Sequence, residues 1–238
     1  MSLLRAPLTL LATYGMGYAL TQPNPPISNE ERAAYRSPEV KLGRLFLLWP
    51  MSMKVINWAN GLCEVGAIVA HNFPRPPLTD RILSMLIGPG HSAASLQVNR
   101  SLLFATFLTT VGSYIRHQCY RTLGRFFTYE LSIRKKHQLV TAGPYSVVRH
   151  PAYTGSILSL AGIHVCIFGP GSLLRASGVL DTEIGKVIIG AAALHGVVMG
   201  YFFISRTIEE DKVLKNQFGE QWDRWAQNVP YRLIPYVF

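Results

Sequence analysis

Two short polar segments of the chain hold side chains that could do chemistry. In the first, residues 137–155, Arg149 and His150 stand directly before Pro151. Gly143-Pro144 is a turn signal and proline suits the first turn of a helix, so a helix is expected to begin near Pro151. Free backbone N–H groups at a helix start can hold an anionic or acceptor-rich ligand. The alternative is that Arg149 and His150 only anchor a helix end among lipid head groups.

The second segment runs from Arg206 to Asp211. On a helix, Arg206 and Glu210 stand one turn apart and share a face. A guanidinium group can hold a carboxylate through two hydrogen bonds, and a neighbouring acid can bind a ligand's ammonium group. The alternative is an exposed Arg–Glu pair of little energetic consequence. Apolar side chains follow at helical spacing and predict packing or an interfacial anchor: Val213, Leu214, Phe218, Trp222 and Trp225.

The composition indicates that these segments are carried by a membrane protein. Of 238 residues, 49% are hydrophobic and only 15% are charged, whereas a soluble domain has about 25% charged residues. The net charge of +10 would suggest nucleic acid as the partner of a soluble chain, but the apolar content argues against that class. Cys63, Cys119 and Cys166 stand far apart, so no disulfide framework and no metal site is expected.

Five apolar runs are candidates for membrane helices, which need about 20 residues. They cover residues 3–20, 42–73, 98–115, 154–174 and 184–205. The first run also fits a cleaved signal peptide. The second fits one kinked helix or a hairpin near Asn60-Gly61, and we favour one helix. The predicted fold is therefore all-α, with about five transmembrane helices and a cytosolic cofactor-binding region built from the C-terminal half.

Three polar residues inside these runs call for an interpretation of their own. Glu64 is a functional candidate because a carboxylate at membrane depth is costly. The alternative is that Glu64 pairs with Lys54 or with another helix. His164 and His195 are expected to be hydrogen-bonded packing residues.

The distribution of charge predicts the topology. Residues 116–153 contain seven Lys or Arg residues and one acid, Glu130, which places this loop in the cytoplasm by the positive-inside rule. The following helical hairpin returns the chain to the same side, so residues 206–238 are expected to be cytoplasmic too. We therefore divide the chain into N-terminal transmembrane helices, 1–115, and a catalytic region, 116–238.

The motifs of the C-terminal half resemble one family. HQLVTAGPYSVVRHPAYTG, then RTIEED, FGEQWDRW and VPYRLIP, are similar to the isoprenylcysteine carboxyl methyltransferase family of integral membrane enzymes. The match covers about residues 127–235, and the N-terminal half is similar only as membrane helices. The resemblance implies methyl transfer from S-adenosylmethionine to the C-terminal carboxylate of a prenylated cysteine. It also implies prenylated proteins and the lipid bilayer as partners, and a multi-pass location in the endoplasmic reticulum membrane with a cytosolic active site.

The resemblance also implies a role for individual residues. Glu210 resembles the acidic contact to the cofactor, and Arg206 resembles the arginine that orients the substrate carboxylate, so these two are the catalytic candidates. Glu130 stands where relatives can have glutamine, and we count it with the cofactor pocket. The other expected pocket residues are His137, Gln138, Leu139, Val140, Tyr145, His150, Pro151, Ala152 and Tyr153.

The implied reaction fits this set of residues. A C-terminal carboxyl group with a pKa of about 3.3 to 3.7 is ionised at neutral pH and needs no general base. It needs alignment with the methyl group at roughly 3 to 3.5 Å and exclusion of water.

Three other functions remain open. An NADPH-dependent membrane sterol reductase is one, because VPYRLIPYVF and the Arg-His-Pro turn also resemble that family, whose members are longer. A phospholipid amine N-methyltransferase shares the cofactor but not the carboxylate acceptor. In a non-catalytic scaffold, Arg206 and the polar loop would be dispensable.

Overall fold

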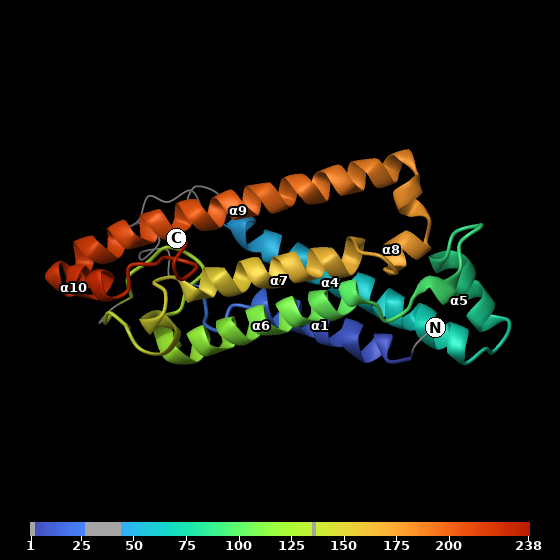
Figure 1. Ribbon diagram of the computed structural model, residues 1–238, viewed down its shortest axis with the longest axis horizontal. Helices are drawn as coiled ribbons and strands as arrows, with labels where there is room; N and C mark the ends of the chain where they lie inside the picture. The colour runs from blue at the N-terminus through green and yellow to red at the C-terminus, as the bar shows by residue number, and fades with distance from the viewer. Residues whose placement is uncertain (1–2, 27–43, 135–136) are drawn as a thin grey trace. The chain divides into compact units, whose positions relative to one another are not determined.

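The structure is a computed structural model that describes residues 3–26, 44–134 and 137–238, of which 44–47 are described by their backbone alone. All regular structure in these ranges is helical, which confirms the predicted all-α class for this part of the chain (Figure 1). The α-helices are α1 (Arg5–Ala19), α4 (Arg44–Asn72), α5 (Leu78–Leu86), α6 (Arg100–Leu123), α7 (Pro151–Phe168), α8 (Leu173–Ala176), α9 (Glu183–Phe218) and α10 (Glu220–Asn228).

The chain forms two compact units that alternate along the sequence. The first unit comprises Met1–Tyr18, Lys54–Val111 and Leu158–Met199, and the second comprises Ala19–Met53, Gly112–Ile157 and Gly200–Phe238. Helices α4, α6, α7 and α9 therefore contribute residues to both units. The division into membrane helices and a catalytic region at residue 116 concerns function, and it stays a prediction.

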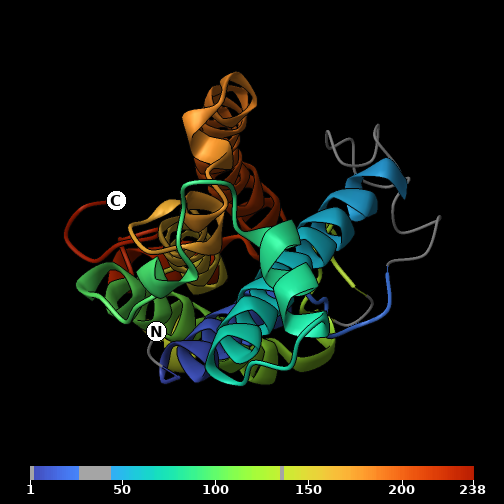
Figure 2. The ribbon, with the colours of Figure 1, turned by 90° about the vertical axis from the view of Figure 1, so that its right-hand side faces the viewer.

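In the first unit, α1 packs closely on α4. A Cβ atom added at Gly61 would lie 2.3 Å from Thr13 Oγ1, so only glycine permits this approach. Helix α4 continues through Asn60-Gly61, which confirms a single helix rather than a hairpin over residues 44–72. Figure 2 shows α5 beside α4. The core of this unit contains Ala67, Ile68, Leu96, Leu173 and Ala176, against which Leu83, Leu86 and Ile87 pack.

Glu64 is fully buried in this unit and pairs with another helix, as one of the two interpretations predicts. Its carboxylate accepts hydrogen bonds from Arg5 Nε at 2.9 Å, Thr9 Oγ1 at 2.7 Å and the backbone N–H of Leu173 at 3.0 Å. Lys54 is not the partner. Glu64 therefore joins α1, α4 and the start of α8.

The two histidines also lie in the first unit. His164 Nδ1 is 2.8 Å from the carbonyl oxygen of Leu160, and the His164 and His195 rings stack with their centroids 5.6 Å apart. The packing interpretation is confirmed for His164, because its ring is hydrogen-bonded within its own helix.

Two helical stretches among the described residues are long and apolar enough to cross a bilayer: Pro151–Ala176 and Glu183–Phe218. Helix α1 has 15 residues, fewer than the roughly 20 that a span needs. Five spans therefore stay a prediction.

The second unit corrects the predicted loop of residues 116–153. Helix α6 runs on to Leu123, so Arg116 and Arg121 lie on a helix. Arg116 does not end the helix because its guanidinium is buried and hydrogen-bonded to Tyr120, Tyr129 and Ala152.

Other local signals in the second unit are confirmed. Gly143, with φ of +60°, begins a 3-10 turn over Gly143–Ser146, and α7 begins at Pro151. The apolar stripe beyond Arg206 is divided between two helices, because Gly219 separates α9 from α10 with φ of +52°.

Candidate active site

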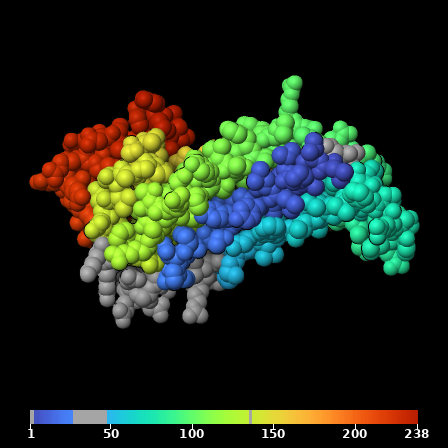
Figure 3. All heavy atoms as spheres, turned by 90° about the horizontal axis from the view of Figure 1, so that it is seen from below, coloured from blue at the N-terminus to red at the C-terminus, as the bar shows by residue number. Residues whose placement is uncertain are grey.

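The start of α7 is held by the C-terminal tail, residues 229–238. The backbone N–H groups of Arg149 and His150 donate to the carbonyl oxygens of Tyr231 and Arg232 at 2.9 and 2.8 Å, and Thr154 Oγ1 donates to Leu233 O at 2.6 Å. Figure 3 shows the red C-terminal residues beside the yellow residues near 150. The expectation of free N–H groups is therefore wrong for Arg149 and His150, because the tail uses both.

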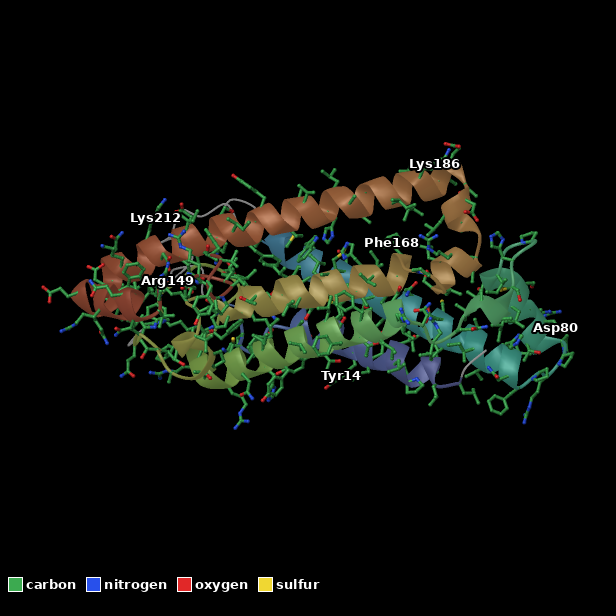
Figure 4. The ribbon with its side chains drawn as sticks, viewed as in Figure 1. Tyr14, Asp80, Arg149, Phe168, Lys186 and Lys212 are labelled. Carbon is green, nitrogen blue, oxygen red and sulfur yellow. The ribbon has the colours of Figure 1, made fainter. Side chains whose placement is uncertain are left out.

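Arg149 is buried and contributes to the same attachment. Its Nη1 donates to the carbonyl oxygens of Val229 at 2.9 Å and Pro230 at 2.8 Å. Figure 4 labels Arg149 next to the start of α7. The idea that Arg149 only anchors a helix end among lipid head groups is wrong, because protein groups surround its guanidinium.

His150 lies between two carboxylates of α9. Its Nδ1 is 3.2 Å from Glu210 Oε2, and its Nε2 is 2.8 Å from Asp211 Oδ1. Ionised carboxylates only accept hydrogen bonds, so both ring nitrogens must carry protons and the ring is an imidazolium. Burial by itself lowers the pKa of His150, but the hydrogen bonds and charges of Asp211 and Glu210 outweigh burial and raise this pKa above 6.5. The lipid-anchor interpretation is wrong for His150 as well.

Asp211 is the most connected acid of this group. Its Oδ1 is bound by His150, and its Oδ2 lies 2.9 Å from Arg232 Nε and 3.3 Å from Arg149 Nη2. Its side chain is only 6% exposed. Sequence reasoning did not single out Asp211, Arg149 or Arg232 as a group. The signal that was present is the run of three acids at positions 209–211 after a long apolar segment.

Glu210 differs from Asp211 in exposure, since 28% of its side chain is accessible. One turn earlier on α9, Arg206 is buried, and its Nε and Nη2 donate to Tyr153 Oη at 3.2 Å and Tyr129 O at 3.3 Å. The structure thus brings together four predicted site residues: His150, Tyr153, Arg206 and Glu210.

Arg116 forms hydrogen bonds with Tyr129, which Arg206 also contacts, and with Ala152, which precedes the second contact of Arg206, Tyr153. It donates to Tyr129 Oη at 2.9 Å and to Ala152 O at 3.1 Å, next to the groups that Arg206 contacts. Sequence reasoning assigned Arg116 only to a charged loop. Had the helix been predicted to continue to Leu123, Arg116 would have stood one helical turn before Tyr120, its hydrogen-bond partner.

The predicted pocket residues of the 137–145 segment differ in their surroundings. The His137 ring lies between Phe126 and Phe218, with centroids 4.6 and 5.8 Å away, and its Nδ1 is buried with no hydrogen-bond partner in the part of the chain described here. Burial lowers the pKa of His137, against the opposing charge of Glu210. Tyr145 is buried, and its carbonyl oxygen accepts a hydrogen bond from Trp225 Nε1 at 3.2 Å.

The remaining predicted residues are less closely tied to the His150 group. Gln138 is exposed and Leu139 and Val140 are half-buried. No hydrogen bond joins these three to His150 or Glu210 among the described residues. Pro151 and Ala152 form the first turn of α7, and Glu130 is buried in the same unit.

The donor and acceptor set of the site suits an organic cofactor better than a metal ion. Glu210 offers a partly exposed carboxylate to an ammonium group, and the buried Nδ1 of His137 has no hydrogen-bond partner among the described residues. No group of three His, Cys, Asp or Glu side chains among the described residues could hold a metal ion.

Comparisons with known proteins were consistent with the motifs. The model described as the isoprenylcysteine carboxyl methyltransferase (ICMT) family matches residues 104–174. Protein-S-isoprenylcysteine O-methyltransferase B of Arabidopsis thaliana is 32% identical over 136 residues, which are 56% of this chain and 59% of the relative. The A protein of the same plant is 30% identical over the same shares.

A sterol reductase is also similar. Delta(14)-sterol reductase of Neurospora crassa is 24% identical over 134 residues, which are 48% of this chain but only 26% of the relative. No solved structure gives a significant match. The chain spans about three fifths of the length of the Arabidopsis methyltransferases that it matches. The resemblance of this chain to the isoprenylcysteine carboxyl methyltransferase family is therefore confirmed.

Proposed function

We propose that the chain is a protein-S-isoprenylcysteine carboxyl O-methyltransferase. It transfers the methyl group of S-adenosylmethionine to the C-terminal carboxylate of a prenylated cysteine. The observation that carries this proposal is the arrangement on α9, where the buried guanidinium of Arg206 stands one turn from the partly exposed carboxylate of Glu210. The family comparison supplies the reaction class.

The cofactor site that we propose is centred on Glu210. A partly exposed carboxylate beside an imidazolium is ionised, and this charge suits the ammonium group of S-adenosylmethionine. His137 Nδ1, which has no hydrogen-bond partner in the described part of the chain, would be a second polar contact. When bound, the cofactor supplies a methyl group on a sulfonium centre. The other residues that would line this pocket are Glu130, Gln138, Leu139, Val140, Tyr145, His150, Pro151, Ala152 and Tyr153.

Arg206 is proposed to orient the substrate carboxylate. This carboxylate is ionised at neutral pH, so the site has to align it and exclude water rather than remove a proton. The hydrogen bonds of Arg206 to Tyr153 Oη and Tyr129 O restrict the guanidinium plane. A restricted plane favours one direction of approach for the carboxylate, and burial of Arg206 limits competition from water.

A membrane location explains how a prenylated substrate reaches this site. Large apolar side chains are exposed along α9, among them Val187, Leu194, Val197 and Tyr201, and the prenyl chain favours a bilayer by about 0.8 kcal/mol per buried CH2 unit. We propose about five spans, a catalytic region over residues 116–238 whose active site faces the cytosol, and residence in the endoplasmic reticulum membrane. The seven cations of residues 116–153 support the cytosolic side.

A direct assay tests the proposal. Purified protein in lipid nanodiscs is given tritiated S-adenosylmethionine and N-acetyl-S-farnesylcysteine, and base-labile methyl ester is counted. We expect ester formation with the free acid and none with the matched carboxamide. Transfer to phosphatidylethanolamine instead would indicate an amine methyltransferase.

The second candidate function is sterol reduction, which the similarity to Delta(14)-sterol reductase favours. The same preparation is incubated with NADPH and a sterol that has a Δ14 double bond. Reduction of the sterol without any methyl ester would overturn the methyltransferase proposal.

A further inference from the structure

His150 connects a partly exposed acid to a buried one. Glu210 Oε2 lies 3.2 Å from Nδ1 of the ring, and Asp211 Oδ1 lies 2.8 Å from Nε2. A neutral imidazole carries one proton, so it would turn a lone pair toward one of the two carboxylates. The hydrogen bonds to Glu210 and Asp211 therefore exist together only when the ring carries both protons. A neutral ring that keeps its proton on Nε2, toward the shorter Asp211 contact, loses the bond to Glu210.

Asp211 is not placed to bind a ligand itself. Both of its oxygens are occupied, Oδ1 by His150 and Oδ2 by Arg232 and Arg149. Its side chain is 6% exposed, compared with 28% for Glu210. Of these two acids, Glu210 is the one that a ligand can reach.

Three segments fix the position of Asp211. Arg149 precedes α7 and is itself bonded to Val229 and Pro230 of the tail, Arg232 comes from the tail, and Asp211 belongs to α9. The tail therefore holds both cations that contact Asp211 Oδ2. This arrangement keeps the Asp211 carboxylate directed at His150 Nε2.

We propose that Asp211 is a positioning residue, which keeps His150 doubly protonated and thereby holds the Glu210 carboxylate in the direction that binds the cofactor's ammonium group. The inference rests on the proposed cofactor role of Glu210. It adds to that role a buried partner and a dependence on pH.

The charges around His150 determine the sign of that dependence. Glu210 and Asp211 face the ring from α9 and favour the imidazolium. The cations of this group have the opposite effect of charge: Arg149 and Arg232 contact Asp211 Oδ2, and Arg206 stands one turn from Glu210 on α9. The Tyr153 ring lies with its centroid 6.0 Å away. The raised pKa of His150 shows that the two carboxylates prevail. Removing the charge of Asp211 is expected to lower this pKa. Removing the charge of Arg232 is expected to raise it, because Arg149 still holds Asp211 Oδ2.

The test measures binding of S-adenosylmethionine by calorimetry between pH 6 and 9, with the full chain in nanodiscs. Asp211→Asn keeps an acceptor oxygen but loses the charge, so we expect the pH above which affinity falls to move down by about one pH unit. In the range between the pKa of His150 in the variant and that in the wild type, the variant should bind about tenfold more weakly. At pH 6 the two proteins should bind alike.

Two further variants separate this role from a structural one. Arg232→Gln should move the pH limit in the opposite direction, which a general loss of packing does not explain. Glu209→Gln is the matched control, because Glu209 is an exposed acid on the same helix and pairs with the exposed Lys212. The pH profile of this variant should equal that of the wild type. If Asp211→Asn does not fold, the shift of Arg232→Gln alone decides the question.

A uniform loss of affinity at every pH in Asp211→Asn, or an unshifted Arg232→Gln profile, would overturn the inference. A wild-type protein that binds no S-adenosylmethionine would contradict the proposed function instead. Nitrogen-15 spectra of the His150 ring then test the role of Asp211 separately, because the pKa of His150 should be lower in Asp211→Asn than in the wild type. An unchanged titration would reject the control of His150 by Asp211.

Discussion

Each compact unit contains a buried ionic group centred on a glutamate of a long helix, and the two groups differ in how completely that glutamate is enclosed. Glu64 on α4 is 0% exposed and accepts hydrogen bonds from Arg5, Thr9 and Leu173. Glu210 on α9 is 28% exposed and is held through His150. The first carboxylate is closed to solvent, and the second is partly open to it.

The comparison shows why a charged residue in an apolar run is ambiguous. Arg5 is 1% exposed and also donates to Gln97 O at 2.7 Å, so the Arg5–Glu64 group ties segments of one unit together. A buried ion pair of this kind is compensated by its own hydrogen bonds. In the second unit Asp211 is likewise held by three side chains, those of His150, Arg149 and Arg232. Glu210 of the same group stays accessible, as a residue that binds a ligand must.

The largest expected effect is on stability, from Glu64→Ala. This change leaves the Arg5 guanidinium buried without its carboxylate, which should cost about 3 to 5 kcal/mol of unfolding free energy. Reversible unfolding of the protein in mixed micelles measures it. The double variant Arg5→Met/Glu64→Ala should recover a large part of the loss. A single-variant loss below about 1 kcal/mol would show that the pair is not a structural link.

Next in size is the effect of Arg206→Ala on the proposed reaction. We expect kcat/KM for farnesylcysteine to fall about 100-fold, which corresponds to about 2.7 kcal/mol, because the acceptor carboxylate loses its orienting group. Affinity for S-adenosylmethionine should change less than twofold. Lys212→Ala, an exposed cation on the same helix, is the control. Equal kinetics in the two variants would remove Arg206 from the site.

Glu210→Gln should weaken the binding of the cofactor rather than the stability of the fold. Loss of a charged contact to the ammonium group is expected to raise the Kd for S-adenosylmethionine about 30-fold, or about 2 kcal/mol. The melting temperature should stay near that of the wild type, in contrast to Glu64→Ala. For each of the two variants, Glu210→Gln and Glu64→Ala, calorimetry measures the Kd and thermal unfolding measures the melting temperature on the same preparation. A Kd that is unchanged while the protein melts early would make Glu210 a structural residue like Glu64.

The smallest effect concerns pH and the His150 group. Because the folded-state pKa of His150 is raised above 6.5, its contribution to stability is complete below the unfolded value and is lost as the pH rises through the folded value. The difference in unfolding free energy between wild type and His150→Gln should therefore be larger at pH 6 than at pH 9, as chemical unfolding at the two pH values would measure. A difference that grows with pH would mean that His150 is neutral in the folded protein.

Sequence reasoning found four members of the candidate site but not the residues that support them. His150, Tyr153, Arg206 and Glu210 were predicted from motifs, and the structure brings them together. Asp211 and Arg232 were missed, because their contacts join residues 61 and 21 positions apart, and neither contact has a local pattern. Arg116 was missed because α6 continues beyond the apolar run, and a side chain satisfied by Tyr129 and Ala152 does not need water.

By itself, the sequence determined the helical class, the breaks at Gly143-Pro144 and Pro151, and the order of the motifs. These features depend on neighbours within one or two turns, whose backbone preferences are local. Only the tertiary structure decided which acids are enclosed and which one is accessible. The partner of Glu64 is 59 residues away and that of Asp211 is 61 residues away, so their burial depends on how distant segments pack and on which donors those segments bring.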